Sequence, residues 1–153
     1  MGLDMYLEKR HYVQRWEHIP DEDQFSVIVT RGGNPTSIKP ERIAYVIEQI
    51  AYWRKANAIH HWFVENVQNG EDDCRDYYVS AEQLKELLTA VNMVLENPEM
   101  GEDMLPTESG FFFGSTNYDE SYRLDLEDTK SQLESLLGED GAEQASYYYR
   151  ASW

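Results

Sequence analysis

The sequence predicts an α+β fold: a small, mostly antiparallel sheet packed with three helices. Three observations predict it. β-prone runs lie toward the two ends of the chain, and three segments between them carry apolar residues at helical spacing. The 153 residues suit one domain, and the content of 41% hydrophobic and 13% aromatic residues is too high for a disordered acidic tail. We therefore expect a single domain over 1–153, whose sheet joins an N-terminal hairpin to a C-terminal aromatic strand.

The N-terminal strands are expected within 2–38. Residues 2–9 contain β-prone side chains and predict a first strand, and the apolar run at 25–30 predicts another. Gly32 and Gly33 follow that run, and both can take positive φ angles, so they predict a tight turn with a short return strand.

The first helix is expected over 40–67. Proline suits the first helical position, which places the start at Pro40. Ile43, Ile47 and Ile50 then recur at intervals of four and three residues, the spacing of one helix face.

Two further helices are predicted by their capping residues. Ser80 with Gln83 forms a capping box before an apolar-periodic segment, which predicts a helix over 80–96. Asn117 followed three residues later by a glutamate offers a second cap, for a helix over 117–137.

Aromatic residues cluster in two short segments. The three phenylalanines at 111–113 predict a buried strand or a strand-like plug. Tyrosines dominate 146–151, where we expect the C-terminal strand, and Trp153 then suggests a docked chain end.

The charge of the chain is strongly negative and unevenly distributed. With 29 acidic and 13 basic residues the net charge is −16, and all of it lies in 61–153, because the first 60 residues are neutral. This excess argues against binding duplex DNA, which requires basic residues to neutralise phosphates. One explanation is that the acids form an ordinary solvated surface. The other is that they form an acidic face that mimics nucleic acid and occupies a basic groove on a partner protein. The candidate residues for that face are Glu71, Asp72, Asp73, Glu82, Glu86, Asp125, Glu127 and Asp128.

The apolar stripe of the first predicted helix becomes polar in its second half. Trp53, Arg54, Asn57, His60 and His61 lie there, and burying such polar groups is costly unless each finds a partner. One interpretation is a ligand pocket in which Arg54 holds an anion, Asn57 and His60 recognise polar groups, and Trp53 stacks on a small nucleotide. The other is a structural hydrogen-bonded network, in which the acids after residue 70 return to pair with Arg54.

Catalytic and metal-binding patterns are weak. Adjacent His60 and His61 point about 100° apart on a helix and cannot easily share a metal, so we expect no metal and no cofactor. Cys74 is the one cysteine, which excludes an intramolecular disulfide, and its acidic neighbours disfavour a reactive thiolate. No apolar run approaches the roughly 18 residues of a membrane span. We assign no catalytic residue, although a small hydrolase that uses His60 or His61 stays open.

Several stretches together resemble a family of small acidic proteins encoded by bacteriophages and prophages. These stretches are MGLDMYL at 1–7, YWRKANAIH at 52–60, DDC at 72–74, LPT and GFFFGS within 105–115, and YYY with the final SW at 147–153. The resemblance implies a phage accessory protein in the bacterial cytoplasm and brings no catalytic residue with it. We therefore expect a non-enzymatic protein that binds and inhibits a host protein with a basic surface, such as a CRISPR-type defence protein. A nucleotide-binding sponge is the alternative.

Overall fold

The structure, a computed structural model, describes residues 2–153 and divides them into two compact units. Unit 1 consists of the described residues up to Lys9 together with Gln49–Trp153, and unit 2 is Arg10–Glu48. The predicted α+β class is confirmed: the described residues form a four-stranded antiparallel sheet, a two-stranded sheet and four α-helices.

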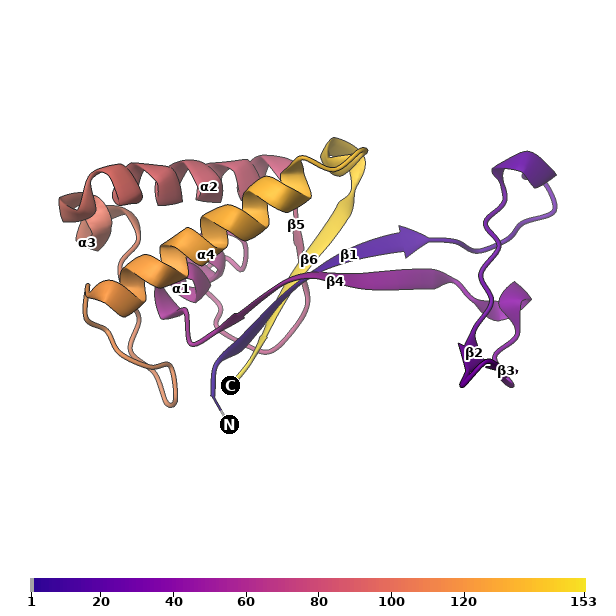
Figure 1. Ribbon diagram of the computed structural model, residues 1–153, viewed down its shortest axis with the longest axis horizontal. Helices are drawn as coiled ribbons and strands as arrows, with labels where there is room; N and C mark the ends of the chain where they lie inside the picture. The colour runs from indigo at the N-terminus through magenta and orange to yellow at the C-terminus, as the bar shows by residue number, and fades with distance from the viewer. Residues whose placement is uncertain (1) are drawn as a thin grey trace. The chain divides into compact units, whose positions relative to one another are not determined.

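The four-stranded sheet has the order β4-β1-β6-β5 (Figure 1). Its strands are β1 (Asp4–Tyr12), β4 (Tyr45–Arg54), β5 (Tyr77–Val79) and β6 (Ser146–Ser152). The C-terminal strand expected over 146–151 is thus confirmed as β6. It pairs antiparallel with β5, and Tyr78 lies opposite Tyr148.

The helices lie in unit 1, where α2 and α4 pack side by side (Figure 1). They are α1 (Asn57–Asn66), α2 (Ala81–Glu96), α3 (Gly101–Met104) and α4 (Glu120–Leu137). The capping box of Ser80 and Gln83 is present at the start of α2, as predicted. The cap of α4 differs from the prediction, because the side chain of Asp119, not that of Asn117, accepts the hydrogen bond from the Tyr122 amide.

The helix predicted over 40–67 is wrong in its first half. Only a 3₁₀ turn, Pro40–Arg42, follows the proline, and the chain then enters β4 before α1 begins. The isoleucine spacing suggested a helix, yet this segment is rich in β-branched and aromatic residues, which favour strands. At the end of β4 burial alternates, with Ala51 and Trp53 inside. Lys55 then adopts a left-handed φ of 57°, which separates the strand from the helix.

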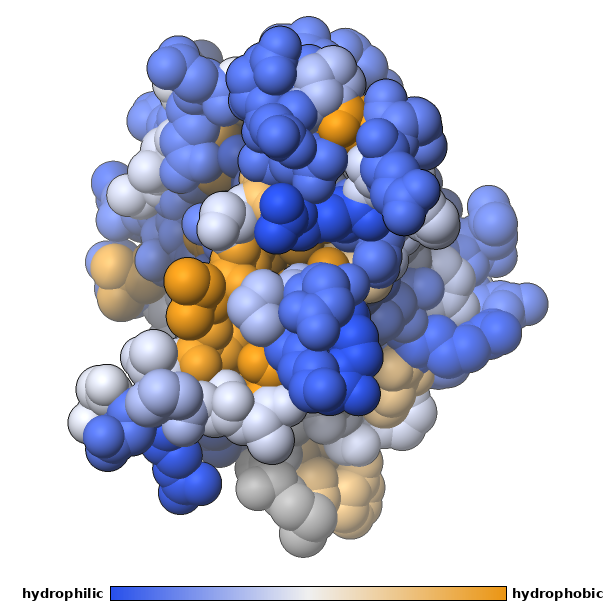
Figure 2. Space-filling view, turned by 90° about the vertical axis from the view of Figure 1, so that its right-hand side faces the viewer, coloured by the Kyte–Doolittle hydropathy of each residue, from blue (hydrophilic) through white to orange (hydrophobic). Residues whose placement is uncertain are grey.

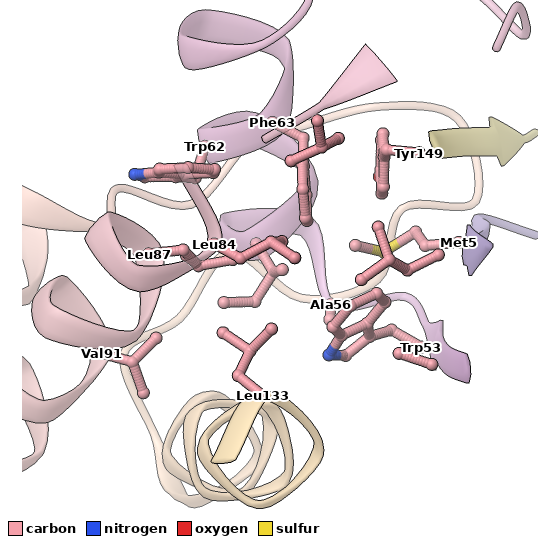
Figure 3. Packing of buried hydrophobic residues seen from close by; sticks show 14 of the residues in the cluster. Met5, Trp53, Ala56, Trp62, Phe63, Leu84, Leu87, Val91, Leu133 and Tyr149 are labelled. Carbon is pink, nitrogen blue, oxygen red and sulfur yellow. The ribbon is translucent and has the colours of Figure 1, made fainter. Parts of the chain in front are cut away.

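The core lies between the sheet and the helices of unit 1 (Figure 3). The rings of Phe63 and Tyr149 stack with centroids 3.8 Å apart and planes inclined by 7°. From β1, alternate residues point into this core, as a half-buried strand requires. Buried aliphatic residues from three elements fill the rest: Leu3, Met5, Leu7, Leu84, Leu87, Val91, Leu126, Leu133 and Leu136. Each such side chain contributes about 1.5–3 kcal/mol when fully buried.

Unit 2 contains a small hairpin of β2 (Thr30–Arg31) and β3 (Asn34–Pro35). Its turn is the predicted one, because Gly32 and Gly33 have φ angles of 59° and 80°. The strand predicted over 25–30 is wrong for all but its last residue. Residues 24–29 have no regular secondary structure, and none of them is buried. They therefore lack the contacts with a neighbouring strand that stabilise a β-strand.

The predicted strand at 111–113 is also wrong. Phe112 has a φ of 67° and Gly114 a φ of 88°, values incompatible with an extended strand. Only Phe113 is buried, whereas Phe111 is 83% exposed. Within residues 2–153, no helix combines the length and the apolar character needed to cross a bilayer.

Candidate functional site

Asn57 and Trp53 serve the packing of unit 1. The Asn57 amide nitrogen donates to the carbonyl oxygens of Phe113 and Ser115 at 3.0 and 2.9 Å, and its side-chain oxygen accepts from the Glu108 amide at 3.0 Å. Trp53 is buried, and its indole nitrogen donates to the Thr129 hydroxyl at 2.9 Å. Both side chains therefore have structural partners of the kind that the network interpretation requires.

His60 is fully buried and both of its ring nitrogens are engaged. Nε2 lies 2.8 Å from a carboxylate oxygen of Asp72, and Nδ1 lies 2.7 Å from the Tyr149 hydroxyl. A carboxylate can only accept, so Nε2 carries the proton and Nδ1 accepts from Tyr149. Burial lowers the pKa of His60 from its ordinary value of 6.5, against the opposing effect of Asp72. The ring is therefore neutral at pH 7 and has no nitrogen left for a ligand.

Arg54 and His61 lie nearer the surface and have partners other than those expected. The Arg54 guanidinium lies 3.3 Å from Asp4. The Nδ1 atom of His61 lies 2.8 Å from a carboxylate oxygen of Glu108. In the acidic loop, Asp72 contacts His60, and Glu71 and Asp73 contact Arg75.

A cavity of about 230 Å³ opens beside Arg54, within unit 1. Its walls come from the connection between β4 and α1, the loop before α4, and the first turns of α4. Of the five predicted ligand residues, Arg54 and Asn57 line this cavity, whereas Trp53, His60 and His61 do not. Lys55 and Asp125 line it too, and our sequence interpretation of this site did not include them.

The eight candidate acids lie on three parts of the chain: the loop after α1, helix α2 and helix α4. Asp125 lines the cavity. The group at 71–73 lies in the loop after α1, where Glu71 and Asp73 pair with Arg75 and where Asp72 binds His60. The remaining four are exposed on the two long helices: Glu82 and Glu86 on α2, and Glu127 and Asp128 on α4.

Two acids of the acidic loop pair with Arg75. Its guanidinium contacts Asp73 at 2.6 Å and Glu71 at 2.9 Å, and the Tyr77 hydroxyl also donates to Asp73. These contacts lower the pKa of Asp73 to about 2. The carboxylates of Glu71 and Asp73 are thus already occupied within the chain, which leaves the helices as the more accessible acidic surface.

Helices α2 and α4, the loop between them and the turn after α4 carry most of the charge. Residues 81–143 include 16 acidic and three basic residues, a net charge of −13. Each of the three bases is paired to a neighbouring acid: Lys85 to Glu143, Arg123 to Glu127, and Lys130 to Glu134. The acids of α2 and α4 lie on two helices that pack side by side (Figure 1).

Unit 2 exposes an unusual amount of apolar surface. Val13 is its one buried residue, whereas eight large apolar side chains are 36–74% exposed. These eight, which we call the apolar set, are Tyr12, Trp16, Phe25, Ile28, Val29, Ile38, Tyr45 and Ile47. Figure 2 shows apolar residues open to solvent among hydrophilic ones on the side that carries β2 and β3. Clustered exposure of this kind marks interaction surfaces.

The sequence interpretation missed the apolar set because six of its eight members were assigned to strands or a helix that would bury them. The available signal was the lack of polar alternation in 25–29, where a half-exposed strand would show it.

No group of three or more histidine, cysteine or acidic side chains within residues 2–153 is arranged to hold a metal ion. No protein-family model, curated protein or solved structure matches the chain.

Proposed function

We propose that this chain is a non-enzymatic accessory protein that binds another protein, with the apolar set of unit 2 as its main contact. The observation that carries the proposal is the burial pattern of Arg10–Glu48. These 39 residues bury Val13 alone and leave eight large apolar side chains in water. Covering apolar surface contributes about 25 cal/mol per Å², so a partner that covers this set gains substantial affinity.

The contacts within unit 2 support a prepared surface. The Tyr12 and Tyr45 rings lie 5.2 Å apart, and the Trp16 indole nitrogen donates to the Tyr12 hydroxyl at 3.0 Å. Three aromatic side chains are thus held against one another while each stays about half exposed. Rigid aromatic residues are frequent among those that dominate binding energy at protein interfaces.

The charges indicate what kind of partner fits. Unit 1 carries 23 acidic and eight basic residues, a net charge of −15, whereas unit 2 carries six acidic and five basic residues, a net charge of −1. A second copy of the chain would bring a further −16 and would be repelled. A partner with an apolar groove for the apolar set and with basic residues for the acids of α2 and α4 is complementary to both units.

The identity of the partner as a host defence protein rests on the resemblance to phage and prophage proteins. In this proposal the acids of α2 and α4 occupy a surface on which the host protein binds nucleic acid, and the chain inhibits the host protein by competition. The charge of −13 over residues 81–143 supports such mimicry.

The test uses the full-length chain in two forms. Phe25→Ser combined with Ile28→Ser removes two exposed members of the apolar set, and Phe111→Ser removes an even more exposed phenylalanine from unit 1. Proteins captured from bacterial cells by the wild type are purified, and their affinities are measured against each form. We expect a basic partner that loses at least tenfold in affinity with the double variant and little with Phe111→Ser.

A second pair of measurements tests the acidic contribution. Charge reversal by Glu82→Lys with Glu86→Lys should weaken the same complex, and so should a rise in salt concentration. Equal affinity of the wild type and the Phe25→Ser/Ile28→Ser variant would overturn the role of the apolar set. A stable homodimer that this variant dissociates would assign the apolar set to self-association instead.

A further inference from the structure

Two of the charged side chains that line the cavity beside Arg54, one cationic and one anionic, form neither an ion pair nor a side-chain hydrogen bond with the described residues. They are Lys55 and Asp125. The two do not pair with each other. An open cavity that keeps opposite charges apart provides two separate attachment points for a ligand.

The backbone of Lys55 at the cavity is held in an unusual conformation. Lys55 has a φ of 57°, a left-handed conformation that costs a non-glycine residue about 1–2 kcal/mol. Its amide donates to the Leu3 carbonyl at 2.7 Å, which holds this conformation in place. Gly114 lies against its stem, since a Cβ atom at Gly114 would be 3.2 Å from the Lys55 Cβ. Strained backbone of this kind concentrates at binding sites, where it aims a side chain.

Asp125 lines the same cavity from the second turn of α4. It is half-buried, and the two charged groups that act on its carboxyl, Asp128 and Asp119, are also acids. Burial and these two neighbours raise the pKa of Asp125 to about 6. At pH 7 its carboxylate is ionised and lacks a cation, so a positively charged group placed beside it gains more than it would at an exposed acid.

The field of unit 1 restricts the net charge of the ligand. Asp119 also lines the cavity, the Arg54 guanidinium already pairs with Asp4, and the unit as a whole carries −15. A nucleoside triphosphate would meet this repulsion with several negative charges of its own. A molecule with one anionic and one cationic group has no net charge, so it avoids this repulsion and can pair with both Lys55 and Asp125.

The size of the cavity favours a small molecule. Its volume of about 230 Å³ lies below the roughly 300–1,000 Å³ typical of pockets for drug-sized ligands. The side chains of Ser115, Asn117 and Ser121 add polar lining, whereas Ala58 and the Tyr122 ring add apolar surface. The lining therefore suits a short carbon chain between two charged ends.

We propose that this cavity binds a small amino carboxylate zwitterion, whose carboxylate pairs with Lys55 and whose ammonium group pairs with Asp125. This inference goes beyond the proposed function, because the cavity lies in unit 1 and uses no residue of the apolar set. The two proposals therefore succeed or fail separately.

The test is a titration of the full-length chain, followed by nuclear magnetic resonance, with amino carboxylates from glycine through γ-aminobutyrate to ε-aminocaproate. We expect at least one member to saturate with a Kd on the order of 1 mM, as two charge-assisted contacts allow. Its N-acetyl derivative and its amide each lack one charge and should bind at least tenfold more weakly. Inorganic phosphate and AMP serve as purely anionic probes.

Matched variants assign the two contacts. Lys55→Met and Asp125→Asn should each weaken binding about tenfold, whereas Lys130→Met and Glu134→Gln, which make the same charge changes on the exposed surface of α4, should not. In the wild type the affinity should fall as the pH drops below about 6, where Asp125 takes up a proton, and Asp125→Asn should remove this dependence. Melting curves establish that each variant is folded.

Two results would overturn the proposal. The first is the absence of saturable binding by every amino carboxylate at about ten times the expected Kd. The second is Lys55-dependent binding of phosphate or AMP that exceeds the binding of the zwitterions, which would assign the cavity to anions.

Discussion

The Nε2 atom of His60 lies 2.8 Å from a carboxylate oxygen of Asp72, and this hydrogen bond ties helix α1 to the loop that follows it. The Trp153 indole nitrogen reaches the same carboxylate oxygen at 3.2 Å. One acid thus joins the buried histidine to the C-terminal end of the chain. The contact explains why a histidine on the inner side of α1 is structural, with a neutral ring and a single tautomer.

The first prediction concerns the pKa of His60. Asp72 raises this pKa, while burial lowers it by a larger amount. Replacing Asp72 by Asn removes the charge and keeps the shape, so the pKa of His60 should fall further below 6.5. Nuclear magnetic resonance titration of the ring nitrogens measures it, with Glu71→Gln as the control from the same loop. A rise in the pKa on Asp72→Asn would contradict the assigned contact.

The lowered pKa of His60 also makes the free energy of unfolding depend on pH. Because the folded-state pKa of His60 is below 6.5, the unfolded chain binds a proton first as the pH falls. The contribution of His60 to stability is therefore complete above about pH 6.5 and is lost as the pH falls toward its folded-state pKa. In the Asp72→Asn variant the folded-state pKa of His60 is lower still, so stability should be lost over a wider pH range. Denaturant midpoints measured from pH 7.5 downward test this order.

The second prediction concerns Asp125, whose raised pKa lowers the stability of the folded chain at neutral pH. Asp125 is protonated in the folded chain up to about pH 6 but in the unfolded chain only up to about 3.8, so it opposes folding increasingly as the pH rises between these values. A shift of this size corresponds to about 3 kcal/mol for a shielded group, and solvent screening reduces it to about 1 kcal/mol here. Asp125→Asn should stabilise the protein by about that amount at pH 7 and have little effect at pH 4. Glu134→Gln is the control from the same helix.

The third prediction concerns Asn57, which holds the loop before α4 through three hydrogen bonds to backbone atoms. Asn57→Ala should cost about 3 kcal/mol of unfolding free energy, because each lost bond leaves a backbone group without its partner. Asn66→Ala, on the same helix, removes a single bond to the Trp62 carbonyl and should cost about 1 kcal/mol. Exchange of the Glu108 amide hydrogen should accelerate in the first variant only.

The sequence predicts well those elements whose signals are local. The capping box of Ser80 and Gln83 and the paired glycines at Gly32 and Gly33 are short motifs with a fixed geometry, and the structure confirms both. The prediction of the first helix is wrong because the conformation of that segment does not depend on local signals alone. Its isoleucine spacing fits a helix, yet pairing with β1 decides the conformation of 45–54, and no local pattern contains that pairing.

The cavity illustrates the same limit at the level of the site. The sequence identified Arg54 and Asn57 through the polar end of an apolar stripe, and it identified Asp125 only as a surface acid. Asp125 lies 70 residues from Lys55 in the chain and reaches the cavity only because α4 packs beside the connection between β4 and α1. The left-handed backbone of Lys55 also has no sequence signal, since glycine or asparagine would be expected there.

The fourth prediction compares two glycines with similar φ angles. Gly114 has a φ of 88° and lies against the Lys55 stem, whereas Gly70 has a φ of 81° and open space around the position of a Cβ atom. Alanine at either position carries the left-handed strain of about 1 kcal/mol. Gly114→Ala should cost about 1 kcal/mol more than Gly70→Ala, since its methyl group must displace Lys55. Chemical denaturation of both variants gives the difference in the free energy of unfolding. Equal losses in the two variants would mean that the contact with Lys55 does not affect stability.

The last prediction separates folding from binding in unit 2. Phe25 and Ile28 are 54% and 74% exposed, so replacing either by serine should change the free energy of unfolding by no more than about 0.5 kcal/mol. Val13 is 4% exposed, and Val13→Ser should destabilise the chain by about 1–3 kcal/mol and accelerate amide exchange within 10–48. Hydrogen exchange with denaturant titration measures both effects. If Phe25→Ser or Ile28→Ser destabilises the chain as strongly as Val13→Ser, then these side chains pack within the folded monomer and cannot be a surface held ready for a partner. If stability is unchanged while affinity for the partner falls, their exposure in the unbound chain is explained by binding alone.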